Sequence, residues 1–215
     1  MKRLTLALTV TLALGGSAQA VILPGGYTSL SGTTTAASPQ LAGTVIEDDV
    51  VPFTFSSSGG TVFGTVQSRV VRSTLDGTLD FYWRIVSDAN SADPIVLFRI
   101  GNFATPVYNG DYATDGLGDI GPDAAYKFPG PAVDFVFGHE GGSELAPGMS
   151  SYFIFLDTNA ITYNRSAFYD LTTHSAISTP FSTFAPTAFV PEPGTSALLA
   201  GGIGLLGLAR RRRQG

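Results

Sequence analysis

The sequence predicts an all-β protein, an antiparallel β-sandwich of jelly-roll-like arrangement, between two apolar terminal segments. Three observations lead to this fold class. Short apolar stretches alternate with turn residues between positions 41 and 171. No stretch of useful length in that region repeats its apolar residues at the helical period. The 15 Phe and 8 Tyr residues provide large side chains for the space between two sheets. A closed barrel is the alternative architecture.

The predicted elements follow the chain in order. Residues 21–40 are expected to form an N-terminal arm or a weak edge strand, and residues 41–171 the folded domain. The acidic residues 47–49 predict a polar turn between its first two strands, and residues 109–131, rich in Gly, Asp and Pro, a long excursion. Residues 172–190, rich in Ser, Thr and Pro, predict a spacer. Eight strands are expected, at residues 41–46, 50–55, 61–71, 79–86, 95–100, 133–137, 151–156 and 167–171.

The clearest local signal is the Asp-Gly pair at residues 76–77, which favours a two-residue type I′ hairpin between two strand-like runs. This turn sets Val70 opposite Trp83, and it places Trp83 on the apolar face of the hairpin. The same register sets Arg69 opposite Arg84, a like-charge pair that destabilises. A longer loop shifted by a residue therefore remains an alternative.

Charge and composition exclude several classes of function. Without the terminal segments, residues 21–190 retain 6 of the 12 basic and 16 of the 17 acidic residues, a net charge of −10. Such a surface repels nucleic acid, so we expect no nucleic-acid partner. Cys is absent, which excludes disulfides, thiol catalysis and zinc–thiolate sites.

An acidic loop is the one candidate for a metal site. Oxygen-rich loops of this kind bind Ca²⁺, although the spacing is not that of an EF-hand, and a solvated loop is the alternative. The sequence predicts no other cofactor. The four carboxylates recur at every fourth position and belong to Asp111, Asp115, Asp119 and Asp123.

Signals for catalysis are absent or incomplete, so we predict that the domain is not an enzyme. His139 and Glu140 lack the second histidine of a zinc protease motif, and no G-x-S-x-G elbow occurs. A pair of strand carboxylates can hydrolyse glycosides, and the candidates are Asp80, Asp134 and Asp157. Exposed aromatic rings can instead stack on sugars in a glycan-binding module, and the candidates are Tyr82, Tyr108, Tyr112 and Tyr126.

The first twenty residues have the layout of a secretory signal peptide. Two basic residues at positions 2 and 3 precede an apolar stretch at residues 4–14. Ala18 and Ala20 occupy the small-residue positions of an A-x-A cleavage site. We therefore expect export, with signal peptidase cutting after Ala20 and leaving Val21 as the new N-terminus.

The C-terminal tail combines three features in order. An extended strip comes first, because proline fixes φ and disfavours helix at the residue before it; it consists of Val190, Pro191, Glu192 and Pro193. The sixteen uncharged residues 194–209 reach roughly 24 Å as a helix, less than the ~30 Å core of a bilayer. A stop-transfer cluster that stays in the cytoplasm ends the tail, with Arg210, Arg211, Arg212 and Arg213.

This tail, residues 191–213, resembles the PEP-CTERM sorting signal of bacteria; a plain single-span anchor is the alternative. The resemblance implies processing by an exosortase, a membrane-embedded cysteine transpeptidase, after a transient stay in the inner membrane. It further implies a Gram-negative host and a place in the cell envelope or at the extracellular surface. We therefore expect a structural envelope or matrix protein associated with exopolysaccharide and biofilm. A glycan-binding module is the alternative, and a secreted glycoside hydrolase is the third hypothesis.

Overall fold

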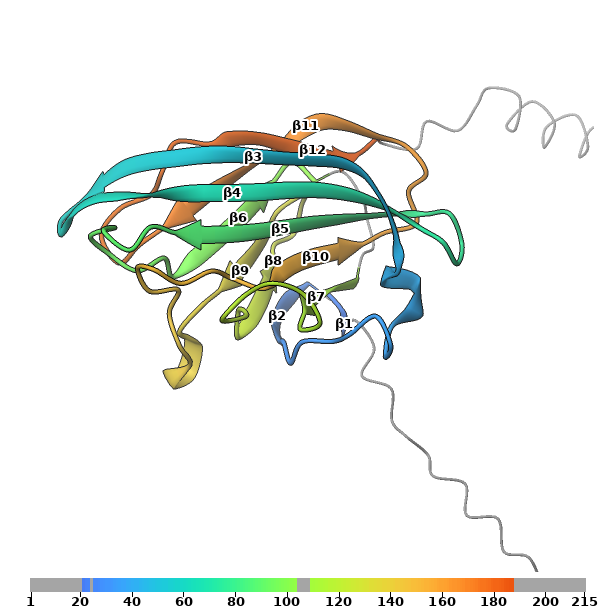
Figure 1. Ribbon diagram of the computed structural model, residues 1–215, viewed down its shortest axis with the longest axis horizontal. Coiled ribbons are helices and arrows are strands. Elements are labelled where there is room, and N and C mark those ends of the chain that lie inside the picture. The colour runs from blue at the N-terminus through green and yellow to red at the C-terminus, as the bar shows by residue number, and fades with distance from the viewer. Residues whose placement is uncertain (1–20, 24, 104–108, 188–215) are drawn as a thin grey trace, which may run out of the picture.

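The computed structural model describes residues 21–23, 25–103 and 109–187, which form two six-stranded antiparallel sheets (Figure 1). Sheet A has the strand order β1-β7-β10-β5-β4-β3 and sheet B the order β12-β11-β6-β9-β8-β2. The strands of sheet A are β1 (Val21–Ile22), β3 (Gly43–Ser57), β4 (Gly60–Ser73), β5 (Leu79–Ser87), β7 (Asn109–Ala113) and β10 (Phe153–Asp157). Those of sheet B are β2 (Gly26–Ser29), β6 (Leu97–Gly101), β8 (Ala124–Lys127), β9 (Val133–Val136), β11 (Tyr163–Thr172) and β12 (Phe181–Pro186). Two 3₁₀ turns, η1 (Pro39–Leu41) and η2 (His139–Gly141), lie in the connections.

The two sheets pack face to face, and their facing side chains form the main hydrophobic core. Trp83 of sheet A lies at its centre and is only 1% exposed. Its ring centroid is 6.3 Å from that of Phe98 in sheet B, and its Nε1 donates a hydrogen bond of 2.8 Å to Oγ1 of Thr183 in β12. The predicted all-β class is therefore confirmed. The described part of the chain has more strands than the eight of a jelly roll. The additional short strands lie in the segments that were predicted to be the N-terminal arm, the long excursion and the spacer.

The hairpin between β4 and β5 keeps the predicted face but not the predicted turn. Val70 lies opposite Phe81 and Arg69 opposite Tyr82, so the register differs from that of a two-residue turn by two residues. A shift of two preserves the side-chain alternation, which is why Trp83 still points into the core. The longer loop also removes the like-charge pair, and Arg69 instead forms an ion pair of 3.0 Å with Asp48.

One long strand replaces the two that the sequence suggests between residues 41 and 55. The predicted polar turn at residues 47–49 is wrong, because β3 runs through it with only a register irregularity between Val45 and Glu47. Residues of β11 in sheet B provide partners for two of the acidic side chains. Glu47 accepts a hydrogen bond of 2.6 Å from the hydroxyl of Tyr163, and Asp49 forms an ion pair with Arg165. These contacts join the β3 edge of sheet A to sheet B.

Residues 172–190 are not simply a spacer. Phe181–Pro186 form β12, the edge strand of sheet B, which is hydrogen-bonded to β11. Phe184 and Ala185 are buried in the main core. The domain therefore extends well beyond residue 171. The sequence hides this strand because only six residues with few β-branched side chains form it, and pairing with β11 supplies its stability.

The other short strands lie in segments that the sequence suggests are irregular. β1 and β2 occupy the predicted arm, where β2 is an edge strand as the alternative foresaw. β7 and β8 lie within the predicted excursion at residues 109–131. Their sequences, Asn-Gly-Asp-Tyr-Ala and Ala-Ala-Tyr-Lys, have little intrinsic β-propensity. Pairing with β10 and β9 holds them in the sheets.

Candidate functional site

The predicted targeting residues lie outside the part of the chain that the structure describes. These are Ala18 and Ala20 of the signal peptide, the strip Val190, Pro191, Glu192 and Pro193, and the cluster Arg210, Arg211, Arg212 and Arg213. Within the described residues, no helix has both the length and the apolar character needed to cross a bilayer. The described chain ends at Thr187, one residue beyond β12.

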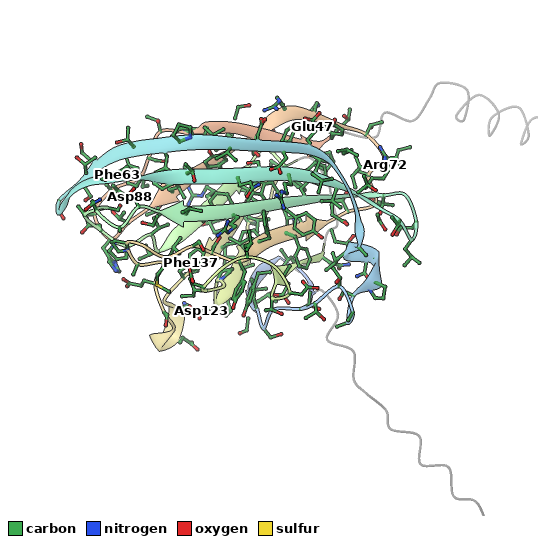
Figure 2. All side chains as sticks on the ribbon, viewed as in Figure 1. Glu47, Phe63, Arg72, Asp88, Asp123 and Phe137 are labelled. Carbon is green, nitrogen blue, oxygen red and sulfur yellow. The ribbon has the colours of Figure 1, made fainter. Side chains whose placement is uncertain are left out.

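The four aspartates of the predicted cation loop do not converge. Each carboxylate instead accepts hydrogen bonds from another segment of the chain, as Asp123, labelled in Figure 2, does from the two residues that follow Phe137. The bonds come from the backbone of Gly32 to Asp111, of Thr35 to Asp115, of Ser150 to Asp119, and of Gly138 and His139 to Asp123. Among the described residues, no three His, Asp or Glu side chains are grouped so that they could hold a metal ion.

The electrostatics of these carboxylates agree with a role in fastening the loops. Backbone and hydroxyl hydrogen bonds from Ser150 lower the pKa of Asp119. Burial acts to raise the pKa of Asp115, but the hydrogen bonds from Thr35 outweigh it and lower that pKa. Burial raises the pKa of Asp111, which lies in β7. The hydrogen bonds from Thr35 and Ser150 thus stabilise the ionised forms of Asp115 and Asp119, and this stabilisation requires no cation.

Calcium is expected to leave the thermal stability of the protein unchanged. A cation that binds only the folded state raises the melting temperature by mass action, and the dispersed carboxylates offer it no shared site. Differential scanning calorimetry in millimolar Ca²⁺, with Mg²⁺ and EDTA as controls, measures this. A melting temperature that rises with Ca²⁺ and returns with EDTA would show that the aspartates do bind a cation.

Two of the three candidate catalytic carboxylates are neighbours, but they do not form a cleft. Asp80 in β5 lies directly opposite Asp157 in β10, whereas Asp134 belongs to sheet B. Asp80 is completely buried, and neither of its carboxyl oxygens has a hydrogen-bond partner. Burial, together with the nearby charge of Asp157, raises the pKa of Asp80 to about 9. A group without access to solvent cannot reach a glycosidic bond, so this pair does not resemble a hydrolase site.

The two histidines lie on different connections. His139 in η2 packs against Tyr27, with ring centroids 4.6 Å apart and the ring planes tilted by 41°. His174 pairs with Glu144, at 2.7 Å between Nε2 and Oε1. Each ring therefore has a local partner among the described residues.

The predicted sugar-stacking tyrosines divide into buried and exposed residues. Tyr82 is buried on the outer side of sheet A and donates a hydrogen bond to the backbone oxygen of Leu41. Tyr112 packs against the main core, and Tyr108 lies outside the described residues. Tyr126 is 37% exposed on the outer face of sheet B. Of the three tyrosines that the structure describes, Tyr126 is the one that presents its ring to solvent as predicted.

Other residues surround Tyr126 that the sequence does not single out. Tyr27 of β2 lies directly opposite it, and the ring of Phe128 is 4.7 Å away in an edge-to-face contact. Asp134 of β9 is its neighbour on the other side. Period-2 alternation in the short β2 and β8 segments is the one sequence signal that could have suggested this group.

Comparison with known proteins concerns the tail. Residues 189–213 match the PEP-CTERM protein-sorting motif. The chain carries a PEP-CTERM sorting tail. This finding confirms the resemblance seen in the sequence, and it marks an exported protein that is targeted to an exosortase and passes through a membrane-anchored state toward the cell surface. No curated protein and no solved structure matches the chain.

The position of the PEP-CTERM motif relative to the fold corrects the predicted spacer. β12 ends at Pro186 and the motif begins at residue 189, so only residues 187 and 188 separate them. The folded domain therefore continues almost directly into the sorting tail.

Proposed function

We propose that this chain is an exosortase-processed protein of a Gram-negative cell envelope or extracellular matrix, with a non-catalytic domain that associates with exopolysaccharide in biofilm. The observation that carries the proposal is the PEP-CTERM motif at residues 189–213, immediately after the last strand of a folded β domain. Signal peptidase and exosortase are the processing partners. The inner membrane is a transient partner, which the tail contacts before it is cleaved.

The structure supports a domain that is independent of its tail. β12 is paired with β11 along Phe181–Pro186, and its inward side chains complete the core. Cleavage beyond residue 189 would remove none of these contacts. A transpeptidase can then transfer the complete domain to its destination while the apolar segment and the arginines stay behind.

The described residues favour a non-catalytic role. Asp80 is shielded from solvent, Asp134 lies in the other sheet, and the two histidines occupy separate connections. The acidic residues fasten loops and strands. What the surface offers instead is an outer sheet face with aromatic rings, which suits binding.

Deleting residues 188–215 is expected to release a folded, soluble domain with a nearly unchanged melting temperature, because β12 and the core are complete before residue 188.

In cells with an exosortase, the intact mass of the envelope form should correspond to a chain that starts at Val21 and lacks the cluster at residues 210–213. Glu192→Gln should impair processing but not insertion, since one carboxylate contributes nothing to hydrophobic anchoring.

Ser196→Ala is the matched control, because it alters the same segment without touching the Pro-Glu-Pro strip. Mass spectrometry of the envelope fraction distinguishes the outcomes. An envelope form that retains its C-terminus through Gly215 would reduce the tail to a plain anchor and would contradict the proposal.

A further inference from the structure

The outer face of sheet B carries one straight row of side chains across five strands. Strand pairing places Asp170 opposite Arg99, Arg99 opposite Asp134, Asp134 opposite Tyr126, and Tyr126 opposite Tyr27. With strands about 4.8 Å apart, the row is roughly 19 Å long. Four of the five residues have strand neighbours that point into the core, so they themselves point away from it; these neighbours include Phe98, Ile100, Ala125, Val133, Phe135, Tyr169 and Leu171. The fifth, Tyr27, lies directly opposite Tyr126 and shares its face.

One half of this row is an exposed aromatic surface. Tyr27 is 43% exposed, Tyr126 37% and Phe128, just beyond Tyr126 on the same face, 36%. The ring of His139 lies against Tyr27 and extends the surface toward η2. Neighbouring exposed aromatic rings mark a binding surface more often than scattered apolar residues do. Their flat faces also lose little conformational entropy when a ligand packs on them.

The other half of the row is polar and nearly balanced in charge. Arg99 forms two hydrogen bonds with Asp134, of 2.8 Å from Nε and 3.2 Å from an Nη. Asp170 lies on the opposite side of Arg99 and is 6% exposed, and its Oδ1 has no hydrogen-bond partner. Asp134 and Asp170 are both covered, whereas the side chain of Arg99 is 36% exposed, so Arg99 is the polar group of the row that a ligand reaches directly. The arginine and the two aspartates together carry a charge of only −1.

We propose that this outer face of sheet B is a binding site for an extended, uncharged glycan. The C–H faces of sugar rings are apolar and pack on aromatic rings, whereas their hydroxyl groups donate to carboxylates and accept from a guanidinium. The face offers aromatic rings at Tyr27 and Tyr126 and, beside them, the partly exposed guanidinium of Arg99, which Asp134 holds in place.

Charge selects an uncharged ligand over an acidic one. The aspartates already compensate Arg99, and residues 21–190 carry a net charge of −10. A polymer of uronic acids would meet repulsion along its length. This site rests on the proposed association with exopolysaccharide. It adds to that proposal the binding surface and the class of polysaccharide.

The test uses the exported protein, purified from the envelope in a detergent without a sugar headgroup. The probes are the uncharged polysaccharide fraction of the producing cells, separated by anion exchange, and polygalacturonate as an acidic polymer. Affinity electrophoresis measures the dissociation constant for each. We expect retention by the uncharged fraction and none by polygalacturonate.

Tyr126→Ala and Tyr27→Ala should each weaken binding to the uncharged fraction about tenfold or more, as removal of a central contact residue does. Val50→Ala, at an exposed position of β3 in the other sheet, is the matched control and should bind like the wild type. Circular dichroism and melting curves verify that each variant is folded.

Three results would overturn the site: no retention by the uncharged fraction, equal retention by polygalacturonate, or full binding by both folded tyrosine variants. This failure is distinguishable from failure of the proposed function, which the mass of the processed chain reports independently. A protein that is cut by exosortase but binds no glycan refutes only the site.

Discussion

Replacing Trp83 with alanine is expected to lower the free energy of unfolding by about 3–5 kcal/mol, the range for removing a large aromatic side chain from a core. Trp83 is 1% exposed and packs against Phe98 in β6 and Phe103 just after that strand. Its loss opens a cavity between the sheets and leaves the hydroxyl of Thr183 without its indole donor. Urea denaturation followed by far-UV circular dichroism measures the change, because the variant lacks the sole tryptophan.

Two further variants separate packing from the hydrogen bond. Trp83→Phe keeps most of the ring contacts but loses the bond to Thr183, so its cost should be smaller than that of Trp83→Ala. Leu75→Ala, in the exposed loop between β4 and β5, should change stability by less than about 0.5 kcal/mol. A loss below about 1 kcal/mol for Trp83→Ala would place the indole outside the core and refute the described register.

Replacing Asp80 with asparagine is expected to stabilise the protein at neutral pH. The carboxyl group is buried opposite Asp157, and burial together with this neighbouring charge raises its pKa from 3.8 to about 9. At pH 7 the folded protein therefore keeps a proton that the unfolded chain releases. Asparagine needs no proton and has nearly the same shape, so it avoids this cost.

The effect has a definite pH dependence. Below pH 3.8 both states of the wild type hold the proton, and its full stability is present. As the pH rises toward 9, the wild type loses about 1.4 kcal/mol for each pH unit relative to Asp80→Asn, and above 9 the difference levels off. Between pH 3 and pH 7 the gain of the variant over the wild type should therefore grow by about 4 kcal/mol.

Asp157→Asn is the informative comparison for this pair. It removes the neighbouring charge but leaves Asp80 buried, and burial is the larger cause of the raised pKa. Its stabilisation should consequently be smaller than that of Asp80→Asn. Urea titrations from pH 3 to pH 9 measure all three proteins. A constant difference between Asp80→Asn and the wild type over this range would show that the pKa of Asp80 is the same in the folded and unfolded states.

Much of the candidate glycan surface was beyond prediction from the sequence. Among the exposed rings of Tyr27, Tyr126 and Phe128, the one that the sequence suggests for sugar stacking is Tyr126. Tyr27 and Asp170 are separated from it by many positions, and nothing local indicates that all three share a row. The row exists because β2, β8, β9, β6 and β11 pair in one particular register.

The four aspartates illustrate the opposite case, in which a visible pattern has another cause. Their regular spacing suggests a common ligand, yet each binds backbone or hydroxyl groups of a different segment. Carboxylates are also the strongest acceptors available for fastening irregular loops. Sequence spacing alone does not distinguish these two roles when the loop conformation is unknown.

The sequence by itself determined the all-β class, the burial of Trp83 and the sorting tail. These depend on local properties: the period of two along a strand, and the order of three adjacent segments at the chain end. The tertiary structure decided the register of β4 and β5, the strand β12, the burial of Asp80 and the row on sheet B. Each of these depends on which strands become neighbours, as when Trp83 meets Thr183, 100 residues further along. Strand pairing over such separations is a property of the whole fold, because the pairing free energy comes from partners that no local segment contains.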